Sequence, residues 1–257
     1  MKKQLKKWAL RLVVTFVFIT LLLIICVLNP LLTYAGKTTH NNYAIFHNKP
    51  FDKALTFHLD EATKLLKKSE FYKPGLMFDI CLNDGSKYPQ LIEKILGHAF
   101  AWGFYNKVVL SGEANYDSNY VGLNGYRWNL TQLLAHELTH CLQYNALGLW
   151  KSDPLGNIPA WKNEGYPEYI ARQNPDQTDL VKNIERLNES IKKDKDAWGI
   201  SFADSTFAGK YYYEWWLLLQ YCMDIKKMTY RQVLKDTTGE ENVRKEMMNW
   251  YNKKFNF

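Results

Sequence analysis

The organising segment of this 257-residue chain is Leu133-Leu134-Ala135-His136-Glu137-Leu138-Thr139-His140-Cys141. It contains the pattern H-E-x-x-H, in which the second histidine follows the first by four positions. Four positions make slightly more than one helical turn, so His136 and His140 lie one above the other on one face of a helix. Two imidazoles placed in this way can share a metal ion, and Glu137 lies beside them without occupying the same ligand position. In proteins with this pattern, such a glutamate is the general base for a metal-held water molecule.

The residues around this segment predict the helix that carries it. Asn129 is placed as its N-cap with Gln132 in the capping-box position, and Gly148 is placed as its end. Thr139 and Gln143 fall on a side of the helix that we expect to be wetter. One broad apolar stripe contains Leu130, Leu134, Leu138, Cys141 and Leu142. We therefore expect the histidines to border the core and line a cleft, with the cysteine as a small core residue.

A third ligand must come from another segment, because two histidines alone make a weak zinc site. The best source is Trp161-Lys162-Asn163-Glu164-Gly165-Tyr166-Pro167-Glu168-Tyr169. H-E-L-T-H followed by W-x-N-E-G-x-x-E-Y resembles the gluzincin zinc metallopeptidases, a peptidase MA-like family, over roughly residues 129–172. The resemblance implies that Glu164 is the third zinc ligand and that Glu168 holds a ligand imidazole, His136, in its tautomer. Taken singly, Glu164 and Glu168 also fit an ordinary solvated helix face.

The resemblance also implies a chemistry. Two imidazoles and one carboxylate would hold one Zn²⁺ per chain and leave a position open for water. Glu137 would take the proton of that water as it attacks a peptide carbonyl, so the substrate would be a peptide or a protein. Related enzymes carry a tyrosine on a later helix that donates to the oxyanion. Matching Tyr221 to that helix gives this role to Tyr212, and Tyr211 and Tyr213 stay open as alternatives.

Two other functions stay open. The metal could be a structural staple in a catalytically inactive domain that binds a partner, although structural zinc sites are normally closed and rich in cysteine. The same site could instead hydrolyse a non-peptide amide, for example at a cell envelope. The sequence does not separate an endopeptidase from an exopeptidase.

The N-terminus predicts a membrane anchor. Residues 1–28 contain five cations and no acid, which account for +5 of the net charge of +7 and leave +2 on the remainder. This distribution argues against a nucleic-acid partner. Residues 12–28 form an apolar run that is typical of a single-pass signal-anchor. The positive-inside rule places residues 1–11 in the cytoplasm and the rest outside the cell membrane, and the alternative is secretion after signal cleavage near Ala35.

The rest of the chain predicts one α+β domain. Residues 29–50 are polar and are interpreted as a stalk, and residues 51–257 as a zinc metallopeptidase-like domain. We expect a small mixed or antiparallel sheet packed on the histidine-bearing helix, with a mainly helical C-terminal half closing the cleft. Hydrophobic periodicity predicts strands over 76–82 and 107–110 and helices over 51–70, 88–96 and 180–191, then from 229 and from 238.

Two further expectations concern the sheet edge and the cysteines. By analogy with gluzincins, the edge that binds the substrate backbone is placed within residues 107–128, where the alternative is a surface hairpin without a substrate role. A disulfide between Cys81 and Cys222 stays open, because the wide cysteine spacing does not determine a pairing.

Overall fold

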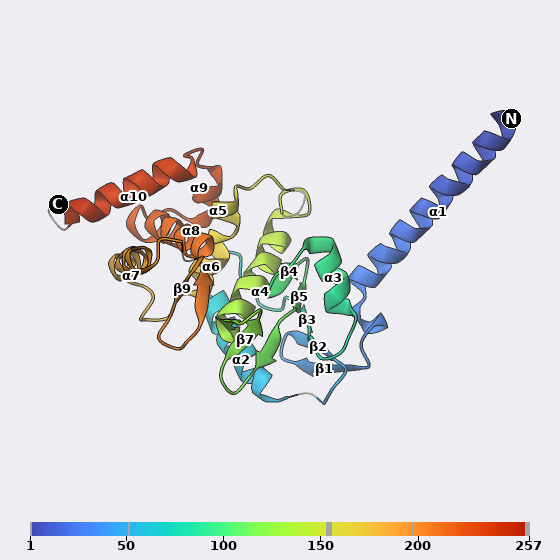
Figure 1. Cartoon of the computed structure of the whole chain (residues 1–257), viewed down its shortest axis with the longest axis horizontal. Helices are drawn as coiled ribbons and strands as arrows, with labels where there is room; N and C mark the ends of the chain where they lie inside the picture. The colour runs from blue at the N-terminus through green and yellow to red at the C-terminus, as the bar shows by residue number, and fades with distance from the viewer. Residues whose placement is uncertain (1, 51, 153–155, 197, 255–257) are drawn as a thin grey trace.

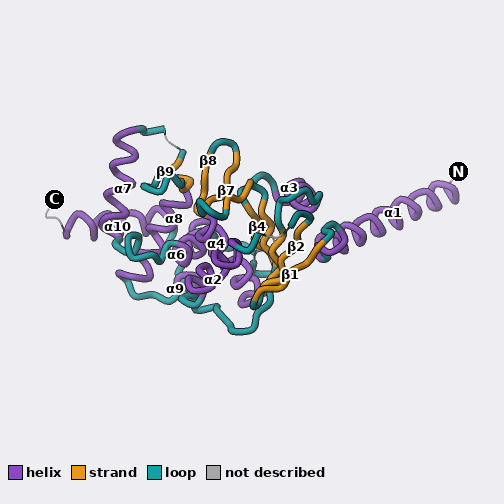
Figure 2. The backbone as a smooth tube through the Cα atoms, turned by 90° about the horizontal axis from the view of Figure 1, so that it is seen from below, coloured by secondary structure: helices purple, strands orange, loops and turns teal. Residues whose placement is uncertain are grey.

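Figure 1 shows the computed structural model of the chain, which describes residues 2–50, 52–152, 156–196 and 198–254. One long N-terminal helix, α1 (Lys2–Leu28), projects from a mixed α+β domain. The two larger sheets lie in the first half of the domain, and the second half is mainly helical with one short pair of strands, as Figure 2 shows. The predicted fold class is therefore confirmed.

The first layer of the domain is a mixed five-stranded sheet with the order β1-β2-β3-β5-β4. The three inner strands are parallel, and each edge strand is antiparallel to its neighbour. The strands are β1 (Gly36–His40), β2 (Tyr43–His47), β3 (Phe78–Cys81), β4 (Ala101–Phe104) and β5 (Lys107–Leu110). The two predicted strands are thus confirmed as the inner strands β3 and β5.

Side chains alternate between the two faces of this sheet, so each inner strand contributes to two cores. On β2, Tyr43 and Ile45 enter the larger core, whereas Ala44 and Phe46 enter the smaller one. The helices α2 (Ala54–Leu66) and α4 (Leu130–Leu147) pack into the larger core, and α3 (Tyr88–Leu96) packs into the smaller one. The α4 helix, which carries H-E-x-x-H, therefore lies between the sheet and the C-terminal helices (Figure 1).

The interpretation of residues 29–50 as a stalk is wrong. β1 and β2 form a hairpin whose turn is Asn41-Asn42, with Asn41 at φ 47°, in the left-handed region that asparagine tolerates. The four residues 43–46 are all buried, as in a strand covered on both faces. The folded domain therefore begins near Tyr34, and not at residue 51.

The remaining elements complete the domain. A three-stranded antiparallel sheet contains β6 (Glu113–Asn115), β7 (Tyr120–Leu123) and β8 (Tyr126–Asn129), and β9 (Gly199–Ser201) pairs with β10 (Phe207–Gly209). The other helices are α5 (Ala160–Asn163), α6 (Gly165–Ala171), α7 (Leu180–Lys193), α8 (Lys210–Gln220), α9 (Tyr230–Lys235) and α10 (Glu240–Lys254). Short helical turns are η1 (Pro30–Leu32) and η2 (Tyr221–Ile225). The predicted helices all exist, and the last begins at residue 240 rather than 238.

This arrangement bears on the cysteines and on the N-terminal helix. Cys81 and Cys222 are both free and belong to different cores, so the open disulfide is not formed. Within α1, residues Lys6–Leu28 are long and apolar enough to cross a membrane.

Candidate metal centre

The α4 helix begins and ends where the sequence predicts. The Asn129 side chain accepts a hydrogen bond from the backbone N–H of Gln132 at 3.1 Å, and Gly148 follows the last turn with φ 81°. The Gln132 side chain does not complete a capping box. It turns inward instead, donating to Gln177 and accepting from Arg172. The cap is therefore confirmed and the reciprocal bond is wrong.

The side of α4 that was expected to be wetter is buried. Thr139 is 0% exposed and Gln143 2% exposed, because α2, α6 and β4 surround this helix. Each polar side chain is satisfied internally: the Thr139 hydroxyl donates to the Ala135 carbonyl, and Gln143 bonds to other helices. Apolar periodicity alone does not detect a helix face that is buried with its polar groups paired. Cys141, in contrast, is a small core residue as predicted.

The third candidate ligand, Glu164, lies at the junction of α5 and α6. The next residue, Gly165, lies where α6 approaches α8 closely. A Cβ at this position would lie 2.7 Å from the Trp215 carbonyl oxygen, so glycine is the residue that fits. Pro167 falls in the first turn of α6, where its missing N–H breaks no helical hydrogen bond. The pattern N-E-G-x-P therefore fits a short helix that presents Glu164 to α4.

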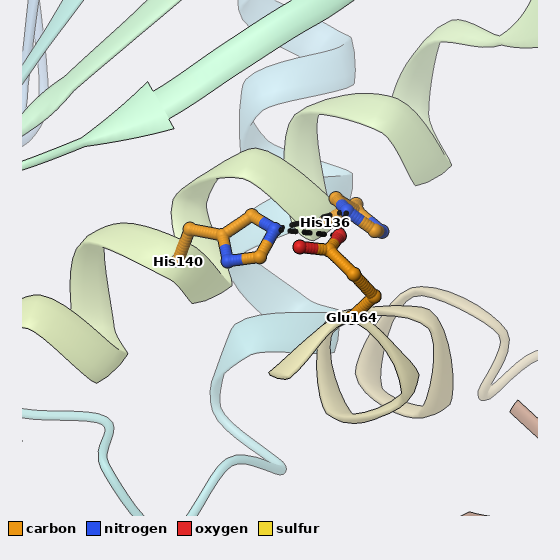
Figure 3. Close-up of side chains that lie close together, drawn as sticks. All are labelled: His136, His140 and Glu164. Carbon is orange, nitrogen blue, oxygen red and sulfur yellow. Dashed lines mark hydrogen bonds and ion pairs between the residues drawn. The ribbon is translucent and has the colours of Figure 1, made fainter. Parts of the chain in front are cut away.

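Three side chains converge on one point, as Figure 3 shows. The Nε2 atoms of His136 and His140 are 3.2 Å apart, and Glu164 Oε2 lies 3.4 Å from the first and 3.2 Å from the second. The potential ligand atoms of the three residues all lie within 4.8 Å of one another. The structure thus brings together the three residues that the sequence placed around a metal.

The chemistry of this donor set fits a cation. Two imidazole nitrogens and a carboxylate oxygen are all electron-pair donors, and at these distances they repel one another unless a proton or a metal ion lies between them. Burial acts to lower the pKa of His136, but Glu164 and Glu168 outweigh it and raise that pKa to about 10. Burial acts to raise the pKa of Glu164, but the two histidines hold it well below its usual range. Two imidazoles with one carboxylate are a zinc donor set.

A charged pair lies behind His136. Its Nδ1 atom is 3.0 Å from Glu168 Oε1, and Glu168 Oε2 accepts a hydrogen bond from the Arg172 Nε–H. Arg172 also donates to Gln132 Oε1 at 3.1 Å. All three side chains are buried, so the carboxylate and the guanidinium compensate each other's charge away from water. Glu168 therefore lies where the sequence placed it, beside His136.

An uncharged group lies behind His140. Its Nδ1 atom is 2.9 Å from Gln143 Oε1, and the same amide donates to the Asn163 carbonyl and to the Tyr230 hydroxyl. Since the amide oxygen only accepts, the proton of His140 belongs on Nδ1, which leaves Nε2 free as a donor to a metal. Gln143 therefore fixes the tautomer of His140 and joins α4 to α5 and α9.

Glu137 projects into the same site from α4. The Gly103 amide of β4 donates to its carboxylate, and a Cβ on Gly103 would lie 2.1 Å from the Glu137 carbonyl oxygen. Burial raises the pKa of Glu137, although His136 and His140 partly offset the effect. The edge strand β4 therefore packs directly against the H-E-x-x-H turn, and only glycine fits at the contact.

The sheet edge next to the metal centre is thus β4, residues 101–104, which lies outside the predicted range 107–128. The strand is short and contains a glycine, so it lacks the composition that marks strands in a sequence. Much of the predicted range folds instead as the β6-β7-β8 sheet, from which Leu123, Tyr126 and Trp128 line another part of the cleft.

Only one of the three candidate tyrosines faces the centre. The Tyr212 ring lies 6.0 Å from the His136 ring and also packs against Trp128. Burial, with the charges of Glu164 and Glu137, raises the pKa of Tyr212. Tyr211 is 71% exposed, and the Tyr213 hydroxyl points away to donate to the Asn183 carbonyl.

The centre opens into a cleft of about 820 Å³. Its lining is largely apolar and aromatic, and Lys210 is its one lysine or arginine among the described residues. The cleft extends from Leu96 and His98, at the end of α3, past β4 to the metal centre and Tyr212. A volume of this size accommodates several side chains of a bound peptide.

Sequence reasoning missed Gln143, Arg172 and Gly103. Two of them had a usable signal: Gln143 follows His140 by three positions and Arg172 follows Glu168 by four, so each shares a helix face with the group it contacts. Gly103 had none, because its role depends on contact with a distant helix. A scan against protein-family models found no family that matches the chain, and a search of curated proteins found no match either.

Proposed function

We propose that this chain is a membrane-anchored, zinc-dependent peptidase. His136, His140 and Glu164 are the zinc ligands, and Glu137 is the general base. The observation that carries the proposal is the convergence of the three donor atoms beside a buried carboxylate, at the wall of an 820 Å³ cleft. A closed structural zinc site would have a fourth protein ligand, usually a cysteine. Among the described residues, no fourth side chain joins the cluster.

The residues of the chain divide the chemistry between them. When bound, zinc supplies Lewis acidity, which acidifies water and polarises a carbonyl group. Glu137 takes the proton of the attacking water and passes it to the leaving amine; its raised pKa suits both transfers. Gly103 orients that carboxylate through its amide. Tyr212, whose hydroxyl is protonated at neutral pH, donates to the developing oxyanion.

The edge strand β4 supplies a site for the substrate backbone. One side of β4 has no strand partner in the described sheet, and this strand borders both the cleft and Glu137. An extended peptide that pairs with it would pass in front of the metal centre.

The proposal keeps α1 as an uncleaved anchor, with the basic residues 1–11 in the cytoplasm and the domain outside. The Tyr34 hydroxyl donates to the Leu82 carbonyl at 2.8 Å, and the Ala35 amide donates to Asn48 Oδ1 at 2.6 Å. Cleavage near Ala35 would remove the buried Tyr34 from the smaller core. Retention of the anchor therefore preserves contacts of the folded domain.

The test is metal content and turnover of the full chain in detergent. We expect close to one zinc per chain, and much less in Glu164→Ala. Glu137→Gln should keep the zinc but lose hydrolysis of a peptide library. A folded chain without stoichiometric metal would refute the proposal, and a zinc-loaded chain without hydrolysis would favour the partner-binding alternative.

A further inference from the structure

The anchor and the domain are joined without a flexible linker. The Tyr88 hydroxyl, at the start of α3, donates to the Val27 carbonyl in the last turn of α1. The Ser86 hydroxyl then donates to the Thr33 carbonyl at 3.0 Å, and Val27 packs against the smaller core. The last turn of α1 and the residue after η1 are thus each bonded to the domain. The end of the anchor and α3 lie side by side in both Figure 1 and Figure 2.

The uninterrupted apolar part of the anchor is shorter than the stretch Lys6–Leu28 that is long enough to cross a membrane. Residues 12–28 span about 26 Å as a helix, whereas a bilayer core is about 30 Å thick. A short span draws its flanking residues toward the hydrocarbon. Those on the domain side are Leu31 and Leu32 of η1, which are 62% and 64% exposed. With α1 as a membrane anchor, the contacts at Val27 and Thr33 would hold the domain at the bilayer surface, with η1 beside the interface.

The cleft begins close to this junction. Tyr88 contacts the anchor, and Leu96, at the other end of α3, lines the cleft. Eight helical rises separate these two residues, about 12 Å. Whichever way α3 tilts, the end of the cleft that Leu96 lines is within that distance of Tyr88. An extended chain covers this distance with about four residues, and further residues take it along the cleft to the metal centre.

We propose that the cleft acts on the juxtamembrane segments of membrane-tethered polypeptides, within the first residues that emerge from the bilayer. The inference rests on the proposed peptidase activity and adds a substrate class to it. The largely apolar lining of the cleft suits segments that flank a membrane span, which are rich in apolar and aromatic residues. The rigid junction selects by distance from the membrane, and not by sequence.

The test uses the full chain in lipid vesicles with a co-reconstituted reporter. The reporter is a single transmembrane helix followed by several identical cassettes in a disordered chain, and the cassette is a peptide that the full chain cleaves when free. Cleavage is mapped cassette by cassette. Because effective concentration falls roughly as the −3/2 power of tether length, a cassette about 10 residues from the bilayer should be cut about 15-fold faster than one about 60 residues away.

A variant with a Gly-Ser insert of about 20 residues between Asn29 and Pro30 raises the domain by about 25 Å. It should cleave the free cassette peptide at the normal rate but lose most of the preference for the nearest cassette. The same insert at the C-terminal end is the matched control and should change neither. Equal cleavage of all cassettes by the unaltered chain, or an unchanged preference in the insert variant, would overturn the inference. If no free peptide is cut at all, the proposed function fails instead.

Discussion

His136 and His140 present the same ring atom to the candidate metal, but the groups behind them differ. His136 contacts Glu168, whose charge is compensated by Arg172, and Arg172 lies over the rings of Phe202 and Trp216. His140 contacts the uncharged amide of Gln143. One candidate ligand is therefore supported by a buried ion pair and the other by a hydrogen-bonded amide.

The difference shows what each support contributes. An ionised carboxylate behind an imidazole makes it a stronger donor to a metal, but it must be kept ionised in a buried place. Burial acts to raise the pKa of Glu168, and Arg172 with His136 outweighs it and lowers that pKa. Gln143 needs no counter-charge, so its two N–H groups can bond to Asn163 and Tyr230. Glu168 would thus strengthen His136 as a candidate metal ligand. Gln143 orients His140 and joins three helices.

The largest expected effect is on stability. Glu168→Ala leaves the Arg172 charge buried without its partner, and such losses cost about 3–5 kcal/mol. Gln143→Ala removes only neutral hydrogen bonds and should cost about 1–3 kcal/mol. Urea unfolding of the full chain in detergent measures both values.

The matched control for this comparison is the double variant Glu168→Gln/Arg172→Met. It removes both charges while keeping the volume, so it should recover most of the stability that Glu168→Ala loses. A double variant as unstable as Glu168→Ala would show that the compensation of charge is not what Arg172 provides.

The next effect is on turnover and concerns Tyr212, whose ring lies beside His136. Tyr212→Phe removes a hydroxyl and keeps the ring contact, so zinc content should be unchanged while kcat falls about 100- to 1,000-fold. Tyr211→Phe, on an exposed side chain, should have little effect on either. Tyr213→Phe should lower stability without lowering kcat, because its hydroxyl bonds to a helix carbonyl. A loss of turnover in Tyr211→Phe comparable to that in Tyr212→Phe would reject the assignment.

The two supports also show how far sequence carries the prediction. The spacing of H-E-x-x-H and the caps of α4 depend on local helix geometry, so the sequence placed the two histidines and the helix ends correctly. Glu164 was chosen through the resemblance of its motif, and the structure brings it beside both histidines. The partner of His136 was found because it belongs to a quoted motif. The partner of His140 was assigned to solvent, because a helix that is buried all round has no polar face for periodicity to find.

The same limit explains the errors in the fold. The inner strands β3 and β5 are apolar runs bounded by turn residues, and they were predicted. The hairpin at Asn41-Asn42 and the edge strand at Gly103 were missed, since a two-asparagine turn was taken for irregular chain and a glycine-bearing strand has no strand signal. The hairpin is local and had a turn signal that was misread, whereas the edge strand becomes visible only when Gly103 meets the distant helix α4.

A smaller effect, on zinc affinity, should distinguish Glu168 from Gln143. Replacing a group that hydrogen-bonds to a metal-binding histidine lowers metal affinity about 10- to 100-fold. We expect Glu168→Gln, which removes a charge, to lose zinc affinity near the upper end of this range, and Gln143→Leu to lose it near the lower end. Competition with a chromophoric chelator measures both. Equal losses would mean that the carboxylate acts only by orienting His136, as the amide orients His140.

The smallest effect is on pH dependence. The pKa of His136 in the metal-free protein is raised to about 10, so at neutral pH zinc must displace a proton from the site. Protonated imidazole does not bind metal; affinity therefore rises with pH, about tenfold per unit for each proton displaced. Glu168 contributes to the raised pKa of His136, after Glu164, so in Glu168→Gln the slope should flatten at a lower pH than in the unaltered chain, whereas Gln143→Leu should leave that pH unchanged. Zinc titrations over a series of pH values from neutral upward distinguish these outcomes. A slope that flattens at a lower pH in both variants would place the proton on the shared centre as a whole, and the carboxylate behind His136 would then have no separate electrostatic role.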